Sequence, residues 1–354
     1  MEAARRAAEE IYARWRTRRG RRILYNSSMS ETPFAWDRLP PGFLALSPMA
    51  GVTDSPFRQI CKRQGADVLF TEMVSAEAFL HHHNRTTREM LHFEPWERPI
   101  ICQLMGSDAA RLAEAARRIE DWGFDGVDLN MGCPAQKIYG NRCGSSLLEY
   151  PDEAAEIVYA MSRATRLPLS VKMRAGVSGS VQPEFARRMV EAGAQALTIH
   201  PRTKEQAYRG RADWTITRAI VEAVPVPVMG SGDLMAWADV ERLFATTGAR
   251  GAFIARGAMG NPWIFRRTDY TPSAQEIVAA VREQAHLALA LKGPHGLIEL
   301  RKHLGWYLKG FDGARELRVR AVQVETLDDV AALLECVLAA TPAPPAAQAA
   351  DIAA

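Results

Sequence analysis

The chain has 354 residues, of which 47% are hydrophobic and 24% are charged, a composition typical of a globular protein with one large domain and a smaller one. No apolar run approaches the roughly 18 residues of a membrane-spanning helix, and no apolar segment follows the charged N-terminus as it would in a signal peptide. We therefore expect a cytoplasmic protein without membrane contact.

Cysteine usage argues against two further kinds of site. The five cysteines are scattered and odd in number, and the chain has no C-x-x-C pair. This pattern predicts neither a zinc site nor a disulfide framework. We expect no bound metal, and a reducing compartment fits the sequence.

The net charge of +3 is unevenly distributed. Residues 1–28 hold eight arginines against three glutamates, a local charge of +5 that leaves −2 for the rest of the chain. A polyanionic partner would therefore be met by a local basic patch and not by a global field. Residues 1–40 show no core-forming period and are predicted to be a basic, poorly ordered extension. Its first 28 residues fit a nucleic-acid-binding arm, a solvated helix, or sequence upstream of a start at Met29.

From residue 43 onward, short apolar runs alternate with helical patterns such as 109–122, 152–165, 183–192, 214–223 and 236–246. The predicted strands are Phe43–Ser47, Val68–Met73, Ile100–Leu104, Gly126–Leu129, Leu169–Met173, Ala196–Ile199, Val226–Met229 and Ala252–Ile254. Eight strands alternating with helices predict an α/β fold, a (β/α)8 TIM barrel over residues 41–269. A doubly wound sheet is the rival, but the first strand is followed by P-M-A-G-V-T-D and not by a G-x-G-x-x-G turn.

The strand rhythm stops after Phe265. Residues 273–292, 295–310, 313–320 and 325–340 show helical patterns, separated by glycine-containing breaks. They predict a small all-helical domain over residues 270–340. The tail, residues 341–354, is rich in proline and alanine and is predicted to be disordered.

Polar and charged residues collect where the predicted strands end, and in a TIM barrel these ends share the face that holds the active site. Each alone has an ordinary explanation, such as a capped turn or a rim lysine with its head in water. Their joint occurrence at successive strand ends favours a functional site. The set comprises Pro48, Met49, Ala50, Glu72, Gln103, Asn130, Cys133, Lys172, Arg174, His200, Arg202, Ser231, Gly232, Asp233, Ala255 and Arg256.

The last two strand ends indicate a phosphorylated ligand. Gly230-x-Gly232 offers unobstructed backbone amides, and Arg256-Gly257 supplies a cation and the start of a short turn. Lys172, Gln103 and Asn130 would then face a polar ring edge, with the thiol of Cys133 across the cavity. A ring with polar edges and a phosphate suggests flavin mononucleotide, FMN, beside which a thiol can donate a proton.

Several motifs together resemble the tRNA-dihydrouridine synthase family, above all its bacterial B-type branch. The similarity runs from about Leu44 to Leu334, and D-x-N-x-G-C-P around Cys133 is only moderately specific by itself. The motifs in order are S-P-M-A-G-V-T-D-S-P-F-R, T-E-M-V-S-A, Q-L-M-G-S-D, G-V-D-L-N-M-G-C-P, V-K-M-R-A-G, I-H-P-R-T, A-R-G-A-M-G-N-P-W-I-F and R-K-H-L-G-W-Y-L-K-G-F.

The resemblance implies a reaction and a set of cofactor contacts. NADPH, or NADH, would reduce FMN, hydride would pass to carbon 6 of a tRNA uridine, and Cys133 would protonate carbon 5. FMN would be held by Pro48, Met49, Ala50, Gln103, Lys172, His200, Gly232, Asp233, Ala255 and Arg256. Ser231 stands where the family usually has Asn, and Ala255-Arg256 where it often has Gly-Arg. Backbone amides can bind phosphate in both cases, so Ser231 stays in the predicted FMN set.

RNA contact requires a basic surface, and residues 301–320 carry a net charge of +4. The alternative is a solvated helix face with Trp306 in the core. Cys143 lies in a glycine-bounded loop that is predicted to close over the substrate, and is interpreted as a bystander. The residues predicted to contact substrate or RNA are Asn130, Lys137, Arg142, Arg202, Arg301, Lys302, Lys309, Arg315 and Arg318.

Two rival functions remain at this point. One is an FMN-dependent barrel that reduces a free small molecule, although such a substrate needs no basic helical domain. The other is a catalytically silent RNA-binding barrel, which the presence of Cys133, Lys172 and Arg256 argues against. No obligate protein partner is predicted.

Overall fold

The computed structural model describes residues 33–81, 85–180 and 183–340. Most of the predicted N-terminal extension and the whole predicted tail lie outside these residues. The described chain forms two compact units, one of residues 33–258 and 262–270 and one of residues 259–261 and 271–340. Each unit is described by itself.

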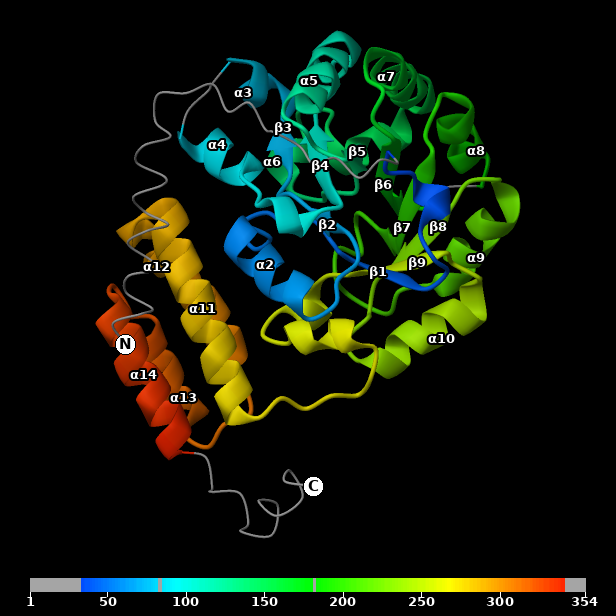
Figure 1. The fold of residues 1–354 in the computed structure, drawn as a ribbon. Helices are drawn as coiled ribbons and strands as arrows, with labels where there is room; N and C mark the ends of the chain where they lie inside the picture. Colours follow the sequence, from blue (N-terminus) through cyan, green and yellow to red (C-terminus); the bar gives the residue numbers. More distant parts are fainter. Residues whose placement is uncertain (1–32, 82–84, 181–182, 341–354) are drawn as a thin grey trace. The chain divides into compact units, whose positions relative to one another are not determined.

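The larger unit is a nearly closed barrel of parallel strands, so the predicted TIM barrel is confirmed (Figure 1). Neighbouring strands follow the order β1-β9-β8-β7-β6-β5-β4-β2, and an isolated bridge between Ala45 and Val68 joins the two ends. The strands are β1 (Phe43–Leu46), β2 (Leu69–Phe70), β3 (Val74–Ser75), β4 (Ile100–Met105), β5 (Gly126–Met131), β6 (Leu169–Gly176), β7 (Ala196–Thr203), β8 (Val228–Ser231) and β9 (Gly251–Ile254).

The predicted second strand is interrupted. It divides into β2 and β3, both of which pair with β4. In the interruption the hydroxyl of Thr71 accepts a hydrogen bond from the backbone N–H of Gln103 and donates to the carbonyl of Glu72. A side chain therefore supplies contacts that a continuous ladder would have supplied from the backbone.

The barrel interior is filled by side chains at one end. Phe43, Phe70 and Phe253 are fully buried there, and Trp36 packs against Phe70 with 6.2 Å between ring centroids. Trp36 belongs to a short 3-10 helix, η2 (Trp36–Arg38), that precedes β1. The interior is a packed core and not a pore, as in other barrels of this size.

Helices cover the outside of the barrel, and the longer ones bury one apolar stripe against the strands. In α5, for example, Leu112 and Ile119 are fully buried, and Asp108 caps the first turn. Figure 1 shows α5, α7 and α8 side by side. The helices of this unit are α2 (Ser55–Arg63), α3 (Ala76–His81), α4 (Arg85–Leu91), α5 (Ala109–Asp121), α6 (Gln136–Tyr139), α7 (Pro151–Ala164), α8 (Pro183–Glu191), α9 (Trp214–Ala223) and α10 (Trp237–Thr247), with 3-10 turns η3 (Pro95–Glu97), η4 (Gly144–Glu149), η5 (Arg256–Ala258) and η6 (Pro262–Arg266).

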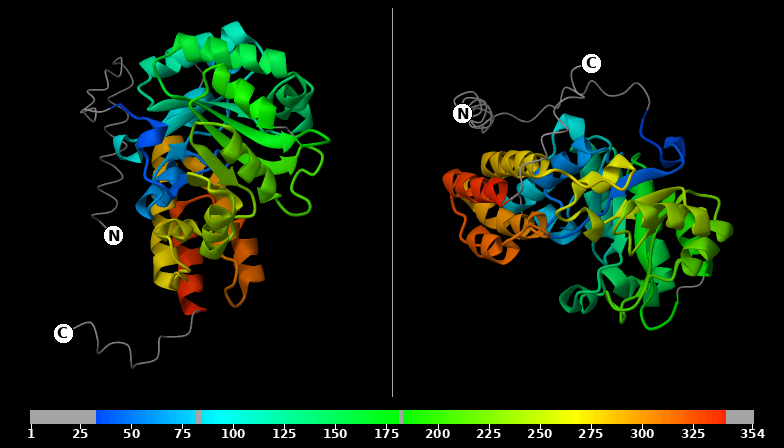
Figure 2. Two further views of the ribbon diagram at one scale, coloured as in Figure 1. Left: turned by 90° about the vertical axis from the view of Figure 1, so that its right-hand side faces the viewer. Right: turned by 90° about the horizontal axis from the view of Figure 1, so that it is seen from below.

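The smaller unit is helical, as predicted for the C-terminal region. Ser273 and Glu276 form a capping box at the start of its first helix, and Gly293, with φ of 67°, ends that helix. Figure 2 shows its first and last helices running alongside each other. The helices are α11 (Ala274–Lys292), α12 (Pro294–Tyr307), α13 (Ala314–Ala321) and α14 (Leu327–Ala339).

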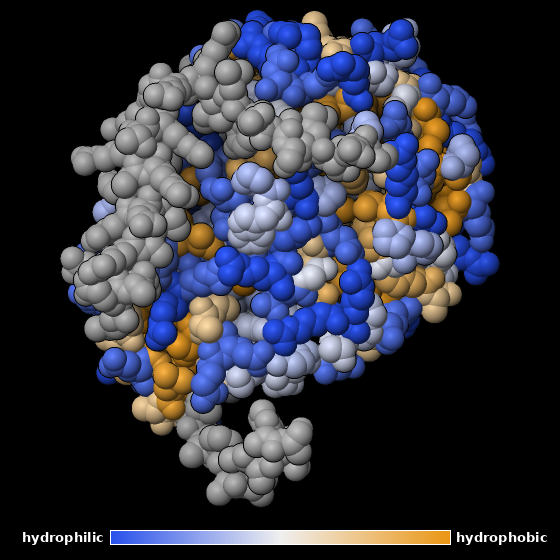
Figure 3. Space-filling model, in the orientation of Figure 1, coloured by the Kyte–Doolittle hydropathy of each residue, from blue (hydrophilic) through white to orange (hydrophobic). Residues whose placement is uncertain are grey.

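Figure 3 shows mostly hydrophilic side chains on one face of the molecule, with apolar residues in separate patches between them. Among the described residues, none of the helices combines the length and the apolar character needed to cross a bilayer.

Candidate active site at the barrel mouth

The carboxyl ends of the strands form one face of the barrel, here called the mouth. Parallel pairing places polar residues of adjacent strands side by side on this face: Gln103 beside Asp128, Asn130 beside Lys172, and Arg174 beside His200. The sequence prediction that these strand-end residues lie together follows directly from this register.

A chain of side-chain hydrogen bonds runs through the mouth. Asp128 is fully buried and accepts hydrogen bonds from the Ser170 hydroxyl at 2.6 Å and from Nε2 of Gln103 at 2.7 Å. Oε1 of Gln103 accepts from Nδ2 of Asn130 at 2.8 Å. Oδ1 of Asn130 in turn accepts from the backbone N–H of Cys133 at 2.9 Å. The fully buried carboxylate is thus connected to the loop that carries the predicted proton donor.

Cys133 is held on both sides of its backbone. Its N–H donates to Asn130, and its carbonyl oxygen accepts from the hydroxyl of Ser145 at 2.9 Å and from the Ser145 N–H at 3.2 Å. Gly144 has a φ of 61°, and a Cβ there would lie 3.0 Å from the Cys133 carbonyl oxygen. The close approach of these two segments requires glycine at 144. The half-buried Cys133 thiol therefore projects from a fixed backbone.

Cys143 has a different environment. Its thiol is buried and donates to the carbonyl of Asn141 at 3.3 Å. Burial raises the pKa of this thiol, although a hydrogen bond with Ser107 acts in the opposite direction. A buried thiol with a raised pKa is a poor candidate for chemistry in the mouth, which fits its interpretation as a bystander.

Lys172 places a desolvated ammonium group in the mouth. Burial, with a contribution from the nearby charge of Arg174, lowers its pKa to about 8 against the attraction of Asp128 and Cys133. Within the described chain this ammonium forms no ion pair. A desolvated cation without a carboxylate partner suits the binding of an anionic ligand.

The pKa of His200 reflects the positive charge of the mouth. Its pKa is lowered to about 2, first by burial and then by the surrounding cations. These cations are Lys172, Arg174, Arg202 and Arg256. His200 is therefore neutral throughout the physiological range and can exchange hydrogen bonds with a ligand without adding charge.

Two buried arginines anchor the loop after β7. Nη1 of Arg174 donates to the carbonyls of Thr203 and Ala207 at 3.1 and 2.9 Å. Arg202 donates to both carboxylate oxygens of Asp233 at 2.7 Å and to the Gly210 carbonyl at 2.7 Å. Arg202 was predicted to contact substrate, but its guanidinium is 1% exposed and is occupied by these partners. Its position supports a role in shaping the loop.

The last two strand ends, where the sequence predicts a phosphate site, approach each other closely. A Cβ at Gly257 would lie 2.0 Å from the carbonyl oxygen of Leu234, so the loops after β8 and β9 touch backbone to backbone. Gly232 has a φ of 92°, and a Cβ there would lie 3.0 Å from the ring of His200. Arg256, by contrast, keeps 42% of its side chain exposed at 3.4 Å from Asp233. Ser231 is buried at the end of β8, and Ala255 is half-buried after β9.

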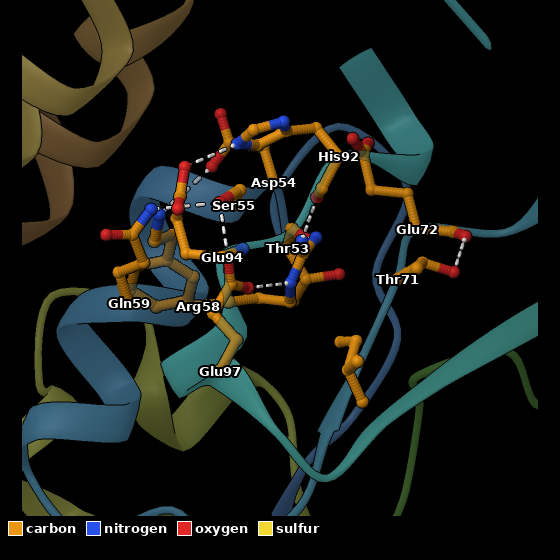
Figure 4. A network of polar contacts seen from close by, with 12 residues as sticks. Thr53, Asp54, Ser55, Arg58, Gln59, Thr71, Glu72, His92, Glu94 and Glu97 are labelled. Atoms are coloured by element: carbon orange, nitrogen blue, oxygen red, sulfur yellow. Dashed lines mark hydrogen bonds and ion pairs between the residues drawn. The ribbon is translucent and has the colours of Figure 1, made fainter. Parts of the chain in front are cut away.

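The loop after β1 is held from behind by a buried polar network (Figure 4). Arg58 and Glu97 are both fully buried, and Nε of Arg58 lies 2.7 Å from Oε2 of Glu97. Nη1 of Arg58 donates to the carbonyl of Thr53 at 2.8 Å, while the Thr53 hydroxyl contacts the backbone N–H of Met49 at 3.0 Å. The network thus fixes the segment that contains the predicted FMN contacts Pro48, Met49 and Ala50.

Two predicted RNA contacts on the barrel, Lys137 and Arg142, lie in the segment that follows β5. Lys137 on α6 is exposed. Arg142 is 3.3 Å from Glu153, and its guanidinium carbon lies 4.3 Å from the ring centroid of Tyr150. Lys204 approaches the ring of Tyr139 at 4.0 Å. Aromatic rings paired with cations in this way provide surfaces on which unstacked bases can bind.

In the helical unit, most of the predicted RNA-binding cations are exposed. Arg301 is the exception, because its Nε donates to the carbonyl of Val324 at 2.8 Å and its guanidinium lies 3.4 Å from Glu325. Tyr307 is core, and Trp306 is half-buried. The exposed members are Lys302, Lys309, Arg315 and Arg318.

Sequence reasoning did not identify three residues that shape the site. Arg58 and Glu97 were not singled out, although Arg58 ends the P-F-R part of a quoted motif. Asp128 was quoted only as part of D-L-N. The sequence could have pointed to Asp128 because a carboxylate inside an apolar strand is rarely tolerated without a hydrogen-bond or ion-pair partner. Among the described residues, no cluster of three or more His, Cys, Asp or Glu side chains could hold a metal ion.

Comparison with known proteins identifies the family. A family model described as Dihydrouridine synthase (Dus) matches residues 45–341. The chain belongs to the dihydrouridine synthase family. The resemblance drawn from the motifs is thereby confirmed.

Relatives of this dihydrouridine synthase cover most of its length. It is 36% identical over 325 residues to the probable tRNA-dihydrouridine synthase 1 of Synechocystis sp., covering 86% of this chain and 91% of that protein. It is 36% identical over 300 residues to tRNA-dihydrouridine synthase B of Pseudomonas aeruginosa, covering 81% and 90%. It is 38% identical over 280 residues to a probable tRNA-dihydrouridine synthase of Rhizobium leguminosarum, covering 76% and 86%.

Proposed function

We propose that this dihydrouridine synthase reduces uridines of tRNA to 5,6-dihydrouridine, using FMN, a nicotinamide reductant and Cys133 as the proton donor. The observation that supports this most is the anchored Cys133 thiol at a mouth where four cations surround a neutral histidine. The relatives are named as enzymes of tRNA, which supports the choice of substrate.

The residues of the mouth fit FMN. Lys172 offers a desolvated ammonium that lacks an ion-pair partner in the described chain, which suits the electron-rich edge of a flavin ring. The backbone at Gly232 and Gly257 leaves no space for side chains, and Arg256 is exposed beside it, which suits a phosphate group. Bound FMN would supply the hydride for carbon 6 of uracil after its own reduction by NADPH or NADH.

Cys133 would deliver the proton. Addition of hydride to carbon 6 leaves negative charge at carbon 5. A thiol near carbon 5 can neutralise that charge by transferring its proton there, and the thiolate can later regain a proton from water. A positioned general acid contributes roughly 10²- to 10⁴-fold to the rate. The hydrogen bonds that clamp the Cys133 backbone keep the thiol where that transfer is needed.

RNA binding would use cations at two places in the chain. Lys137, Arg142 and Lys204 lie on loops of the barrel, and the helical unit exposes Lys302, Lys309, Arg315 and Arg318. A uridine inside folded RNA must be extruded to reach a barrel active site, and phosphate contacts help to offset that cost. A cytoplasmic location stays a prediction that suits this substrate.

The decisive experiment maps dihydrouridine position by position in tRNA from cells that lack the gene. We expect the loss of one or a few positions and their recovery with the wild-type gene or Cys143→Ala, but not with Cys133→Ala. Purified Cys133→Ala should retain the flavin absorption spectrum and lose tRNA-dependent oxidation of reduced flavin. Unchanged tRNA despite bound FMN, with redundant enzymes deleted, would favour a reductase of small molecules.

A further inference from the structure

The direction of every hydrogen bond between Asp128 and Cys133 is determined by chemistry. Both carboxyl oxygens of Asp128 accept hydrogen bonds, Oδ1 from Ser170 and Oδ2 from Gln103, whose amide therefore presents Nε2 to it at 2.7 Å. Oε1 of Gln103 then lies on the opposite side and requires a donor, which Nδ2 of Asn130 provides at 2.8 Å. That in turn leaves Oδ1 of Asn130 facing the loop after β5.

The far end of the chain requires the same direction. The backbone N–H groups of Gly132 and Cys133 can only donate, and both point to Oδ1 of Asn130, at 3.1 and 2.9 Å. Two amides that could each rotate by 180° are therefore fixed between a carboxyl group whose two oxygens both accept and two backbone groups that can only donate. Reversing either amide would set donor against donor or acceptor against acceptor inside a buried network.

Asp128 is a costly residue to bury. Burial raises its pKa to about 7, although the hydrogen bonds from Ser170 and Gln103 and the charge of Lys172 all act to lower it. A fully buried carboxyl group of this kind weakens the barrel core relative to a neutral residue of the same size. It supplies two acceptor oxygens to the network, whereas asparagine would supply one.

We propose that Asp128 is a positioning residue whose carboxylate sets the direction of the hydrogen bonds through Gln103 and Asn130 and thereby holds Cys133 in place. This inference rests on the proposed role of Cys133 as proton donor. Asparagine at 128 has only one acceptor oxygen. If Oδ1 accepted from Gln103, Nδ2 would face the Ser170 oxygen, and the buried Ser170 hydroxyl would lose its acceptor. If Oδ1 accepted from Ser170 instead, Nδ2 would face Gln103. The amide of Gln103 would then have to reverse, followed by that of Asn130, which would turn an N–H toward the N–H groups of Gly132 and Cys133.

The structure suggests a compensating exchange. In the double variant Asp128→Asn, Gln103→Glu, the amide at 128 donates to a carboxylate at 103, whose other oxygen accepts from Nδ2 of Asn130. The network keeps its single negative charge, and Asn130 keeps its original orientation. Thr165→Ala is the matched control, because it removes a hydroxyl that donates to another carboxylate, that of Glu120, outside this network.

The test measures the two half-reactions separately, at saturating FMN, with NADPH and an unmodified tRNA transcript. Asp128→Asn should keep flavin reduction by NADPH and slow the oxidation of reduced flavin by tRNA about 10- to 100-fold, as expected for a displaced catalytic group. Its solvent deuterium isotope effect should increase, because proton transfer becomes rate-limiting. The double variant should recover most of the rate, and Thr165→Ala should remain close to wild type.

A second readout does not depend on turnover. The rate at which iodoacetamide alkylates Cys133, followed by mass spectrometry, should change in Asp128→Asn and return in the double variant, with the fully buried Cys61 and Cys102 as unreactive internal standards. Wild-type behaviour of Asp128→Asn in both assays would overturn the proposal, as would a double variant no better than the single one. Normal turnover by Cys133→Ala would instead refute the proposed proton donor, while the alkylation result would still test the role of Asp128.

Discussion

Buried charge is arranged in opposite ways at two places in the barrel. Behind the loop after β1, Arg58 and Glu97 neutralise each other, and each nitrogen of the guanidinium donates a hydrogen bond. At the mouth, four cations surround His200, and among the described residues only Arg202 and Arg256 of these four form an ion pair, with Asp233. Balanced charge holds a backbone in place, whereas unbalanced charge prepares a site for a ligand of opposite sign.

Removing one member of the balanced pair should have the largest effect. Glu97→Ala leaves the guanidinium of Arg58 buried without its partner, so we expect the free energy of unfolding to fall by about 3–5 kcal/mol. Chemical denaturation measures the loss. The exposed pair of Arg218 and Glu222 provides the control, and Glu222→Gln should change stability by less than about 0.5 kcal/mol. Equal effects of the two substitutions would refute the distinction between the regions.

At the mouth, removal of a cation should reduce ligand affinity while stability is maintained. Lys172→Met should weaken FMN binding about 10- to 100-fold, the value of a charge-assisted contact. Quenching of flavin fluorescence measures the dissociation constant, and thermal unfolding of the FMN-free protein provides the stability comparison. Lys172→Arg should bind FMN more tightly than Lys172→Met because it keeps the charge.

The same lysine predicts a pH dependence. With a pKa of about 8 in the FMN-free protein, Lys172 is protonated below that pH and neutral above it. Because the charged form binds the anionic ligand, the dissociation constant for FMN should rise by up to about tenfold per pH unit above pH 8 and stay flat just below it. Lys172→Met should lack this inflection between about pH 7 and about pH 9.5, and an identical profile in both proteins would contradict the assignment.

A smaller effect on stability and FMN affinity is expected at Gly257, where the backbone of the loop after β9 contacts that of the loop after β8. Gly257→Ala would place a Cβ 2.0 Å from the Leu234 carbonyl and force the loops after β8 and β9 apart. We expect a stability loss of about 1–3 kcal/mol together with weaker FMN binding. Gly179→Ala is the matched control, since a Cβ there meets nothing within 4 Å and should change neither quantity. If Gly257→Ala leaves FMN affinity unchanged, these loops do not form the phosphate site.

The strands, their order and the strand-end residues could be predicted because they depend on patterns within short segments. Parallel register alone places Gln103 beside Asp128, Lys172 beside Asn130, and His200 beside Arg174. The structural role of Arg202 could not be predicted, because its ion-pair partner Asp233 is 31 residues away in the sequence. Likewise, Arg58 and Glu97 are 39 residues apart, and no local pattern pairs them. Residues whose role is set by one distant partner are the ones that sequence alone leaves undetermined.

The packed end of the barrel has a kinetic consequence. In the described part of the chain, Trp36, Phe43, Phe70 and Phe253 pack together and fill that end, which leaves the mouth as the open end of the barrel. A nicotinamide and an RNA that both act on a flavin at the mouth must approach by the same opening. They would therefore exclude each other, and the electron pair would be stored on the enzyme between two visits. Double-reciprocal plots for the two substrates should then give parallel lines.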